Sequence, residues 1–297
     1  MSNPPKLPPE LECTIFEIAA LARPKMIPSL ILVAHRVKHW VEPLLYRVIM
    51  VVPPNEALEF DTLQFPLFTF EILFKVIATK PLEFLQNAVR YLYIDGPVES
   101  AELQSICTAC KHVVSLFHYE GPRARLVPEL LDNLQHLRYL ALSFDILRDC
   151  HTGRQTSCVS HITRLELFDT QEDPWVDDLC RYLPLMTCLT HIAFDSVLHD
   201  QPVQTALLAT KNLRCILLLV NADYVSQRLR NLDPLLLEDD RFLCLGQAQD
   251  WREEWLQGAA MGENFWAVAD SFLVARRNGK VDRSRFTISD TDTSWRD

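Results

Sequence analysis

Apolar residues recur through the middle of the chain in short runs that share one spacing. The pattern apolar-x-x-apolar-x-apolar begins at residues 89, 113, 137, 162, 189 and 213, so successive runs start 24 to 27 residues apart. Each run has the length and alternation of a β-strand. In the second run, His118 takes the place of the last apolar residue. Tyr46–Val52 and Phe242–Leu245 have similar character and predict further strands on either side of the series.

Between these runs, residues 100–110, 127–134 and 176–183 carry apolar residues three and four apart, which predicts short helices. A strand, a turn and a returning helix form one unit, and such units stack because none can bury its apolar side alone. A period of 20 to 29 residues is typical of leucine-rich repeats. The sequence therefore predicts an α/β fold with a leucine-rich-repeat-like solenoid over residues 89–247. An ordinary doubly wound α/β sheet stays as the alternative.

The regions that flank the series have different patterns. Residues 50–88 predict a helical linker with a first strand, including a buried helix over Pro66–Ala78. Residues 248–280 predict two helices, over 248–257 and 264–277, and we expect them to cap the last repeat, since an open array must cover its end. Residues 281–297 are polar and predict a disordered tail.

The N-terminal segment, residues 6–49, predicts three short helices with more apolar residues than one internal face needs. The helix starts are marked by Pro8–Pro9 and Pro28. Extra apolar side chains on a small helical unit indicate either a partner site or a surface that packs on the following domain. Composition alone leaves both possibilities open.

This segment resembles an F-box, and is closest to the F-box-like proteins of mushroom-forming fungi. The resemblance rests on Leu7–Leu11, Ile15–Phe16, Leu30–Ala34 and Trp40–Tyr46. It implies docking on the adaptor subunit of an SCF-type, cullin-based ubiquitin ligase. The side chains that the resemblance places in this contact are Leu7, Pro8, Leu11, Ile15 and Val33.

Strand alternation predicts which residues of the repeats point away from the core. Tyrosine and arginine are frequent among them, and these residue types often anchor interfaces. We therefore expect a recognition face for a protein target. It would be built from Tyr91, Tyr93, Ser115, Phe117, Tyr139, Arg164, Glu166 and His191.

The charge of the chain narrows its partners. Lys and Arg number 29 against 39 Asp and Glu, a net charge of −10. That balance argues against nucleic acid and against an anionic membrane, so we expect a protein partner with basic or apolar surface. The nine cysteines are scattered and no secretory signal precedes them, which predicts reduced thiols in a cytoplasmic or nuclear protein.

Residues with catalytic or metal-binding chemistry are few. Cys107 and Cys110, near His112 and His118, have partial zinc-ligand spacing but lie on a predicted apolar helix face. A second loose cluster contains Cys150, His151, Cys158 and His161. No glycine-rich phosphate loop or nucleophile motif occurs. The sequence thus predicts no enzyme and no metal or other cofactor. It predicts a substrate-recognition adaptor of an SCF-type ligase, with a non-catalytic repeat scaffold as the alternative and an enzyme as the least favoured hypothesis.

Overall fold

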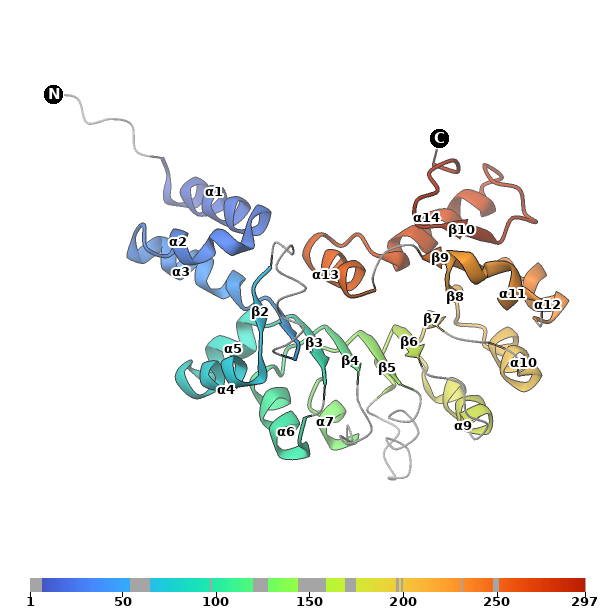
Figure 1. The fold of residues 1–297 in the computed structure, drawn as a ribbon, viewed down its shortest axis with the longest axis horizontal. Coiled ribbons are helices and arrows are strands. Elements are labelled where there is room, and N and C mark those ends of the chain that lie inside the picture. The colour runs from blue at the N-terminus through green and yellow to red at the C-terminus, as the bar shows by residue number, and fades with distance from the viewer. Residues whose placement is uncertain are drawn as a thin grey trace.

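The protein is an α/β protein built on one large parallel sheet (Figure 1). The computed structural model describes residues 7–53, 65–96, 98–119, 128–143, 159–168, 175–195, 198, 200–230, 232–247 and 251–296. Within these ranges the sheet is ten-stranded, in the order β10-β9-β8-β7-β6-β5-β4-β3-β1-β2. Every pair of neighbouring strands is parallel. The strands are β1 Val48–Val51, β2 Leu67–Phe68, β3 Tyr91–Asp95, β4 Ser115–Tyr119, β5 Tyr139–Ser143, β6 Arg164–Phe168, β7 His191–Phe194, β8 Cys215–Asn221, β9 Phe242–Gln247 and β10 Thr287–Ser289.

The strand order confirms that the evenly spaced apolar runs are lateral neighbours. Leu92 on β3 pairs with Leu116 on β4, which pairs with Leu140 on β5. The same register continues through β6, β7 and β8. Because the order from β3 to β10 never reverses, the sheet is not doubly wound, and that alternative is wrong.

One face of the sheet is covered by the helices that connect the strands (Figure 1). Leucine and isoleucine side chains of successive strands form one continuous core beneath these helices. Burying each such side chain stabilises the fold by about 1.5–3 kcal/mol, so the repeated pattern accounts for the stacking. The helices over this face are α4 Phe70–Thr79, α5 Leu82–Ala88, α6 Ser100–Ala109, α7 Pro128–Asp132, α9 Trp175–Tyr182, α10 Gln201–Ala209, α11 Val225–Leu229 and α12 Pro234–Glu238, with short 3₁₀ turns at Leu183–Leu185 and Ala222–Tyr224.

The helix predicted over Pro66–Ala78 begins later than expected. Leu67–Phe68 is the edge strand β2, and α4 starts only at Phe70. Thr69 sets this start, because its hydroxyl accepts the backbone N–H of Ile72 at 3.3 Å. The prediction of a helix was therefore right, but its first turn and its burial were predicted wrongly, since Leu73 is the one residue of α4 that is buried.

The other face of the sheet is covered by the two C-terminal helices, α13 Trp251–Met261 and α14 Phe265–Arg277. Both helices lie where the sequence predicts them, but they do not cap the end of the array. They pack across the sheet face because its positions are themselves apolar: Met50, Tyr93, Phe117, Ala141, Ala193, Leu217 and Leu243. Gly262, at φ +78°, ends α13, and Asn264 caps α14 by accepting the N–H of Ala267 at 3.1 Å.

The expectation of a disordered tail over 281–297 is wrong for the described residues up to 296. Thr287–Ser289 forms β10 and pairs with β9, which places it at the edge of the sheet. Trp295 is buried, its ring centroid 5.5 Å from that of Phe272. The prediction failed because it rested on the polar composition of the segment. A few widely spaced apolar side chains, including Val281 and Ile288, pack against α14.

The N-terminal segment contains α1 Pro9–Ala22, a 3₁₀ turn at Pro24–Met26, α2 Ile27–Leu30 and α3 His35–Leu45. Short helices therefore occur where the sequence predicts them. They enclose a small core of their own around Ala20, Ile27, Val37 and Val41. Pro43 lies in the last turn of α3, which ends two residues later at Leu45.

Candidate protein-interaction site

Large apolar side chains are exposed on the N-terminal helices. Leu11 and Ile15 are each 52% exposed and lie one turn apart on α1. We call the whole set the N-terminal apolar surface. It comprises Leu7, Leu11, Ile15, Ile18, Leu21, Met26, Leu32 and Val33. Exposed apolar side chains gathered on one small unit are characteristic of protein contact sites.

The two parts of this surface are held together by an ion pair. The Arg36 guanidinium at the start of α3 donates to both carboxylate oxygens of Glu12 on α1, at 3.1 and 2.6 Å. This hydrogen bonding lowers the pKa of Glu12. The pair places the first turns of α1 beside the loop that carries Leu32 and Val33.

The alternative in which this apolar excess packs on the following domain is wrong for the side chains of the N-terminal apolar surface, because they remain exposed. Phe16 and Trp40 turn inward instead, with ring centroids 6.5 Å apart, and pack on the small helical core. The side chains that the F-box resemblance selects, Leu7, Pro8, Leu11, Ile15 and Val33, all lie on the exposed side.

The predicted recognition residues of the repeats do share one face of the sheet. The register joins Tyr91, Ser115, Tyr139, Arg164 and His191 in one row across five strands. A second row contains Tyr93, Phe117 and Glu166, two residues further along the same strands. Strand alternation therefore predicted their common orientation correctly.

Their expected exposure is wrong for five of them, because α13 and α14 lie over this face; Tyr91, Tyr139 and Arg164 remain half-buried. Tyr93 is fully buried and Phe117 is 3% exposed. The Tyr93 ring lies 5.3 Å from that of Trp255 on α13. Asp270 on α14 accepts from Arg164 at 3.3 Å and lies 2.8 Å from His191 Nε2. This face is an intramolecular interface between the sheet and the C-terminal helices.

Buried carboxyl groups lie at this interface. The Tyr139 hydroxyl donates to Glu166, and Glu254 of α13 accepts the backbone N–H of Phe265 at the start of α14. The pKa of Glu166 is raised to about 8, chiefly by burial; the Tyr139 hydrogen bond opposes this rise, and the charges of Glu254 and Asp195 add to it. Burial likewise raises the pKa of Glu254 to about 7. Burial therefore disfavours the charged forms of both carboxyl groups at this interface.

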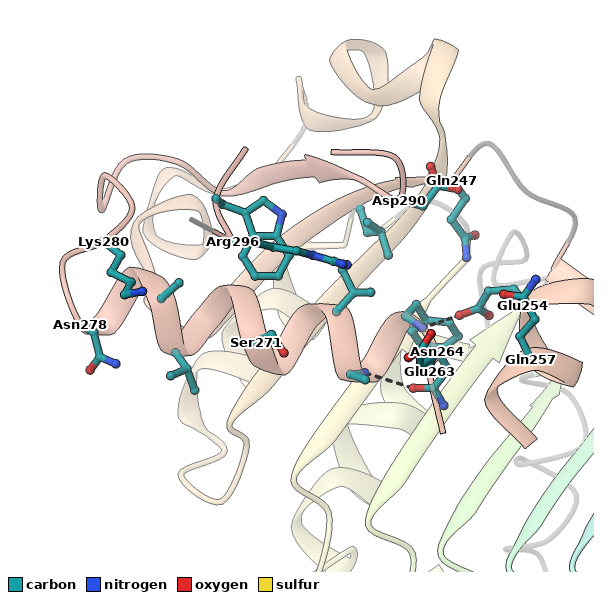
Figure 2. Close-up of a pocket in the computed structure, with 17 residues that line it drawn as sticks. Gln247, Glu254, Gln257, Glu263, Asn264, Ser271, Asn278, Lys280, Asp290 and Arg296 are labelled. Carbon is teal, nitrogen blue, oxygen red and sulfur yellow. Dashed lines mark hydrogen bonds between the residues drawn. The ribbon is translucent and has the colours of Figure 1, made fainter. Parts of the chain in front are cut away.

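A cavity of about 760 Å³ lies between α14, the ends of β9 and β10, and the C-terminal segment. Figure 2 shows Glu254, Glu263 and Asn264 at one end of the cavity, Asn278 and Lys280 at the other, and Ser271 between them. Ser271 is among the described residues that line the cavity. None of these residues is a histidine, which could act as its base, or a cysteine, which could act as a nucleophile itself. The described lining also includes the carboxyl groups of Glu254 and Glu263 and the ammonium group of Lys280, so the cavity can accept polar groups.

The cysteine clusters do not form metal sites within the described ranges. Cys107 and Cys110 are buried on α6, and burial raises the pKa of the Cys107 thiol to about 12. No group of three or more His, Cys, Asp or Glu side chains in the described part could hold a metal ion. Of the second cluster, Cys150, His151 and Cys158 lie outside the described residues.

His118 is fully buried, which lowers its pKa to about 4.

The fold and these surfaces define an α/β protein in which strands β3 to β10 follow one another across a single parallel sheet. No known protein-family model matches the chain, and a search among curated proteins finds none similar to it. In the described ranges, no helix combines the length and apolar character needed to cross a membrane.

Proposed function

We propose that this chain is a substrate-recognition adaptor of an SCF-type ubiquitin ligase. Residues 6–49 act as the F-box, and the strand-and-helix units act as a leucine-rich-repeat-like solenoid. The observation that carries the proposal is the N-terminal apolar surface, which contains four of the five side chains that the F-box resemblance selects: Leu7, Leu11, Ile15 and Val33. A protein with this role acts in the cytoplasm or the nucleus.

The partner of the N-terminal apolar surface is the adaptor subunit of the ligase. Leu7, Leu11, Ile15 and Val33 offer aliphatic contact, and the small apolar core shared by α1 and α3 fixes the relative position of these helices before binding. A contact that is already organised costs less ordering entropy on association. The regular spacing of the strands supports the solenoid half of the proposal.

The test is binding of the purified full-length chain to the SCF adaptor subunit, measured by calorimetry. A double variant, Leu11→Glu with Ile15→Glu, is expected to weaken binding by about 100-fold or more, since each substitution removes roughly 1.5–3 kcal/mol of apolar burial. Leu235→Glu is the matched control, because Leu235 is 64% exposed but lies on α12, outside this surface.

Circular dichroism of each variant verifies that the chain remains folded. Failure of the unaltered chain to bind the adaptor would contradict the proposal, as would equal binding by the double variant. If a target protein then still bound the chain, the non-catalytic scaffold would be the better description of its function.

A further inference from the structure

A cavity of about 300 Å³ lies at the carboxyl ends of the strands, beside the first turn of α13. It is bordered by the ends of β4, β6, β8 and β9 and by Trp251. Ligands of parallel α/β sheets commonly bind outside the carboxyl ends of the strands. The volume lies at the lower end of the range for ligand sites.

One wall of the cavity is aromatic. Phe117 stacks on Phe168, with ring centroids 5.3 Å apart, and on Trp251, at 5.1 Å. Tyr119 leans against this stack, 5.4 Å from Phe168 and 5.9 Å from Trp251, and remains 37% exposed. The faces of such rings are electron-rich and attract cations.

The polar wall is acidic. Glu166 on β6 is 7% exposed and borders the cavity together with Asp195, which directly follows β7. The charge of Asp195 contributes to the raised pKa of Glu166, which indicates that the two carboxyl groups act on the same space. Asn221 and Gln247 also border this space and carry amide oxygens that can accept hydrogen bonds.

Leu219 and Val220 of β8 complete the lining of the cavity. The cavity therefore combines flat rings and acceptor groups around one opening.

The chain binds one of its own guanidinium groups in a similar environment. The guanidinium carbon of Arg252 lies 4.9 Å from the ring centre of Trp251, and its Nη2 donates to Asp95 at 2.9 Å. Asp95 ends β3, just as Asp195 follows β7. An aromatic face beside a carboxylate is thus already used here to hold an arginine side chain.

We infer that this cavity binds a guanidinium group, supplied by an arginine side chain of the recognised protein. A guanidinium ion can stack with its flat face on the exposed Tyr119 ring of the aromatic wall while its N–H groups donate to Glu166 and Asp195. A quaternary ammonium ion has no donor for these acceptors. That the guanidinium group belongs to an arginine of a recognised protein rests on the proposed function. That the cavity binds a guanidinium group does not rest on it.

The experiment uses the full-length chain and calorimetry with five probes: methylguanidinium, tetramethylammonium, free arginine, an arginine-containing peptide and the same peptide with citrulline in place of arginine. Methylguanidinium is expected to bind better than tetramethylammonium, and the peptide better than the same peptide with citrulline in place of arginine. Equal binding of the two small cations, or of the two peptides, would overturn the guanidinium assignment. A peptide no tighter than free arginine would overturn its origin in a protein target.

Two variants test the location. Asp195→Asn and Tyr119→Leu should each weaken methylguanidinium about tenfold, the effect of losing one charge-assisted hydrogen bond or one cation–π contact. Asp240→Asn is the control for the loss of charge, since Asp240 is exposed and does not border the cavity. Unchanged binding in both test variants would refute the site. The Leu11→Glu/Ile15→Glu variant should bind methylguanidinium normally, so this inference and the ligase proposal can fail separately.

Discussion

Glu166 makes the stability of the fold depend on pH, and Glu166→Gln should reduce that dependence. The folded protein raises the pKa of this carboxyl group from 4.5 to about 8, chiefly through burial. Between these two values the folded state holds a proton that the unfolded chain releases. Stability must therefore fall as pH rises through this window, because the folded state binds more protons than the unfolded state.

The magnitude follows from the width of the window. Each unit of pKa difference corresponds to about 1.4 kcal/mol, so ionisation linked to Glu166 removes about 3 kcal/mol of stability between pH 4.5 and pH 7. Glu254, with a pKa raised to about 7, adds a loss over the same range. Glutamine does not ionise, and its amide oxygen can still accept from the Tyr139 hydroxyl. Glu166→Gln should thus remove about half of the pH slope and be the more stable protein at pH 8.

Urea denaturation at pH 5, 6, 7 and 8, followed by circular dichroism, measures the free energy of unfolding at each pH. Glu263→Gln is the control for changing a carboxyl group to an amide, since Glu263 is exposed. Parallel pH profiles for Glu166→Gln and the unaltered chain would refute the reasoning. They would mean that Glu166 is ionised in the folded protein at neutral pH and that the interface tolerates its charge.

Three further outcomes follow from the same contacts. Leu140→Ala, in the continuous core, should cost about 2–5 kcal/mol in urea denaturation, whereas Leu32→Ala, on the exposed surface, should change stability by less than about 0.5 kcal/mol. Arg252→Met should cost about 3 kcal/mol by the same measurement, because it leaves the buried Asp95 carboxylate without its ion pair. Methylguanidinium should bind more tightly as pH rises from 6 to 9 and release protons in calorimetry, since Glu166, which faces Tyr139, Glu254 and Asp195, must ionise to accept it.

The sheet could be predicted because each strand is marked by a short local pattern of apolar residues, and this pattern is repeated along the chain. Positions such as Leu92, Leu116 and Leu140 recur at an almost constant spacing, and each repeat buries the same side of its strand. The exposure of the N-terminal apolar residues could also be predicted, because a unit of this size has too little interior to bury all its apolar side chains. Both features depend on residues close together in the sequence.

The second layer could not be predicted, because its contacts join residues far apart in the chain. Tyr93 meets Trp251 and Trp255, and Arg164 meets Asp270 more than a hundred residues later. An aromatic residue at an outward strand position is typical both of an open binding face and of a covered one. The signal for a covered face was that Ala141, Ala193 and Leu217, on the same face, are also apolar. Exposing such side chains to water is unfavourable.

The N-terminal apolar surface and the strand-end cavity are far enough apart to be occupied together. The N-terminal helices lie beyond the β1 side of the sheet, whereas Asp195 follows β7, five strand positions from β1 (Figure 1). At about 4.8 Å per strand, this separation is roughly 24 Å. An adaptor must hold the ligase and the target at the same time, and sites this far apart are expected to act independently. Adding Asp195→Asn to the Leu11→Glu/Ile15→Glu variant should therefore leave the loss of adaptor binding unchanged and weaken methylguanidinium by the same factor as Asp195→Asn alone. A combined effect that departs from these single effects by more than about 0.5 kcal/mol would mean that the two sites are coupled through the sheet.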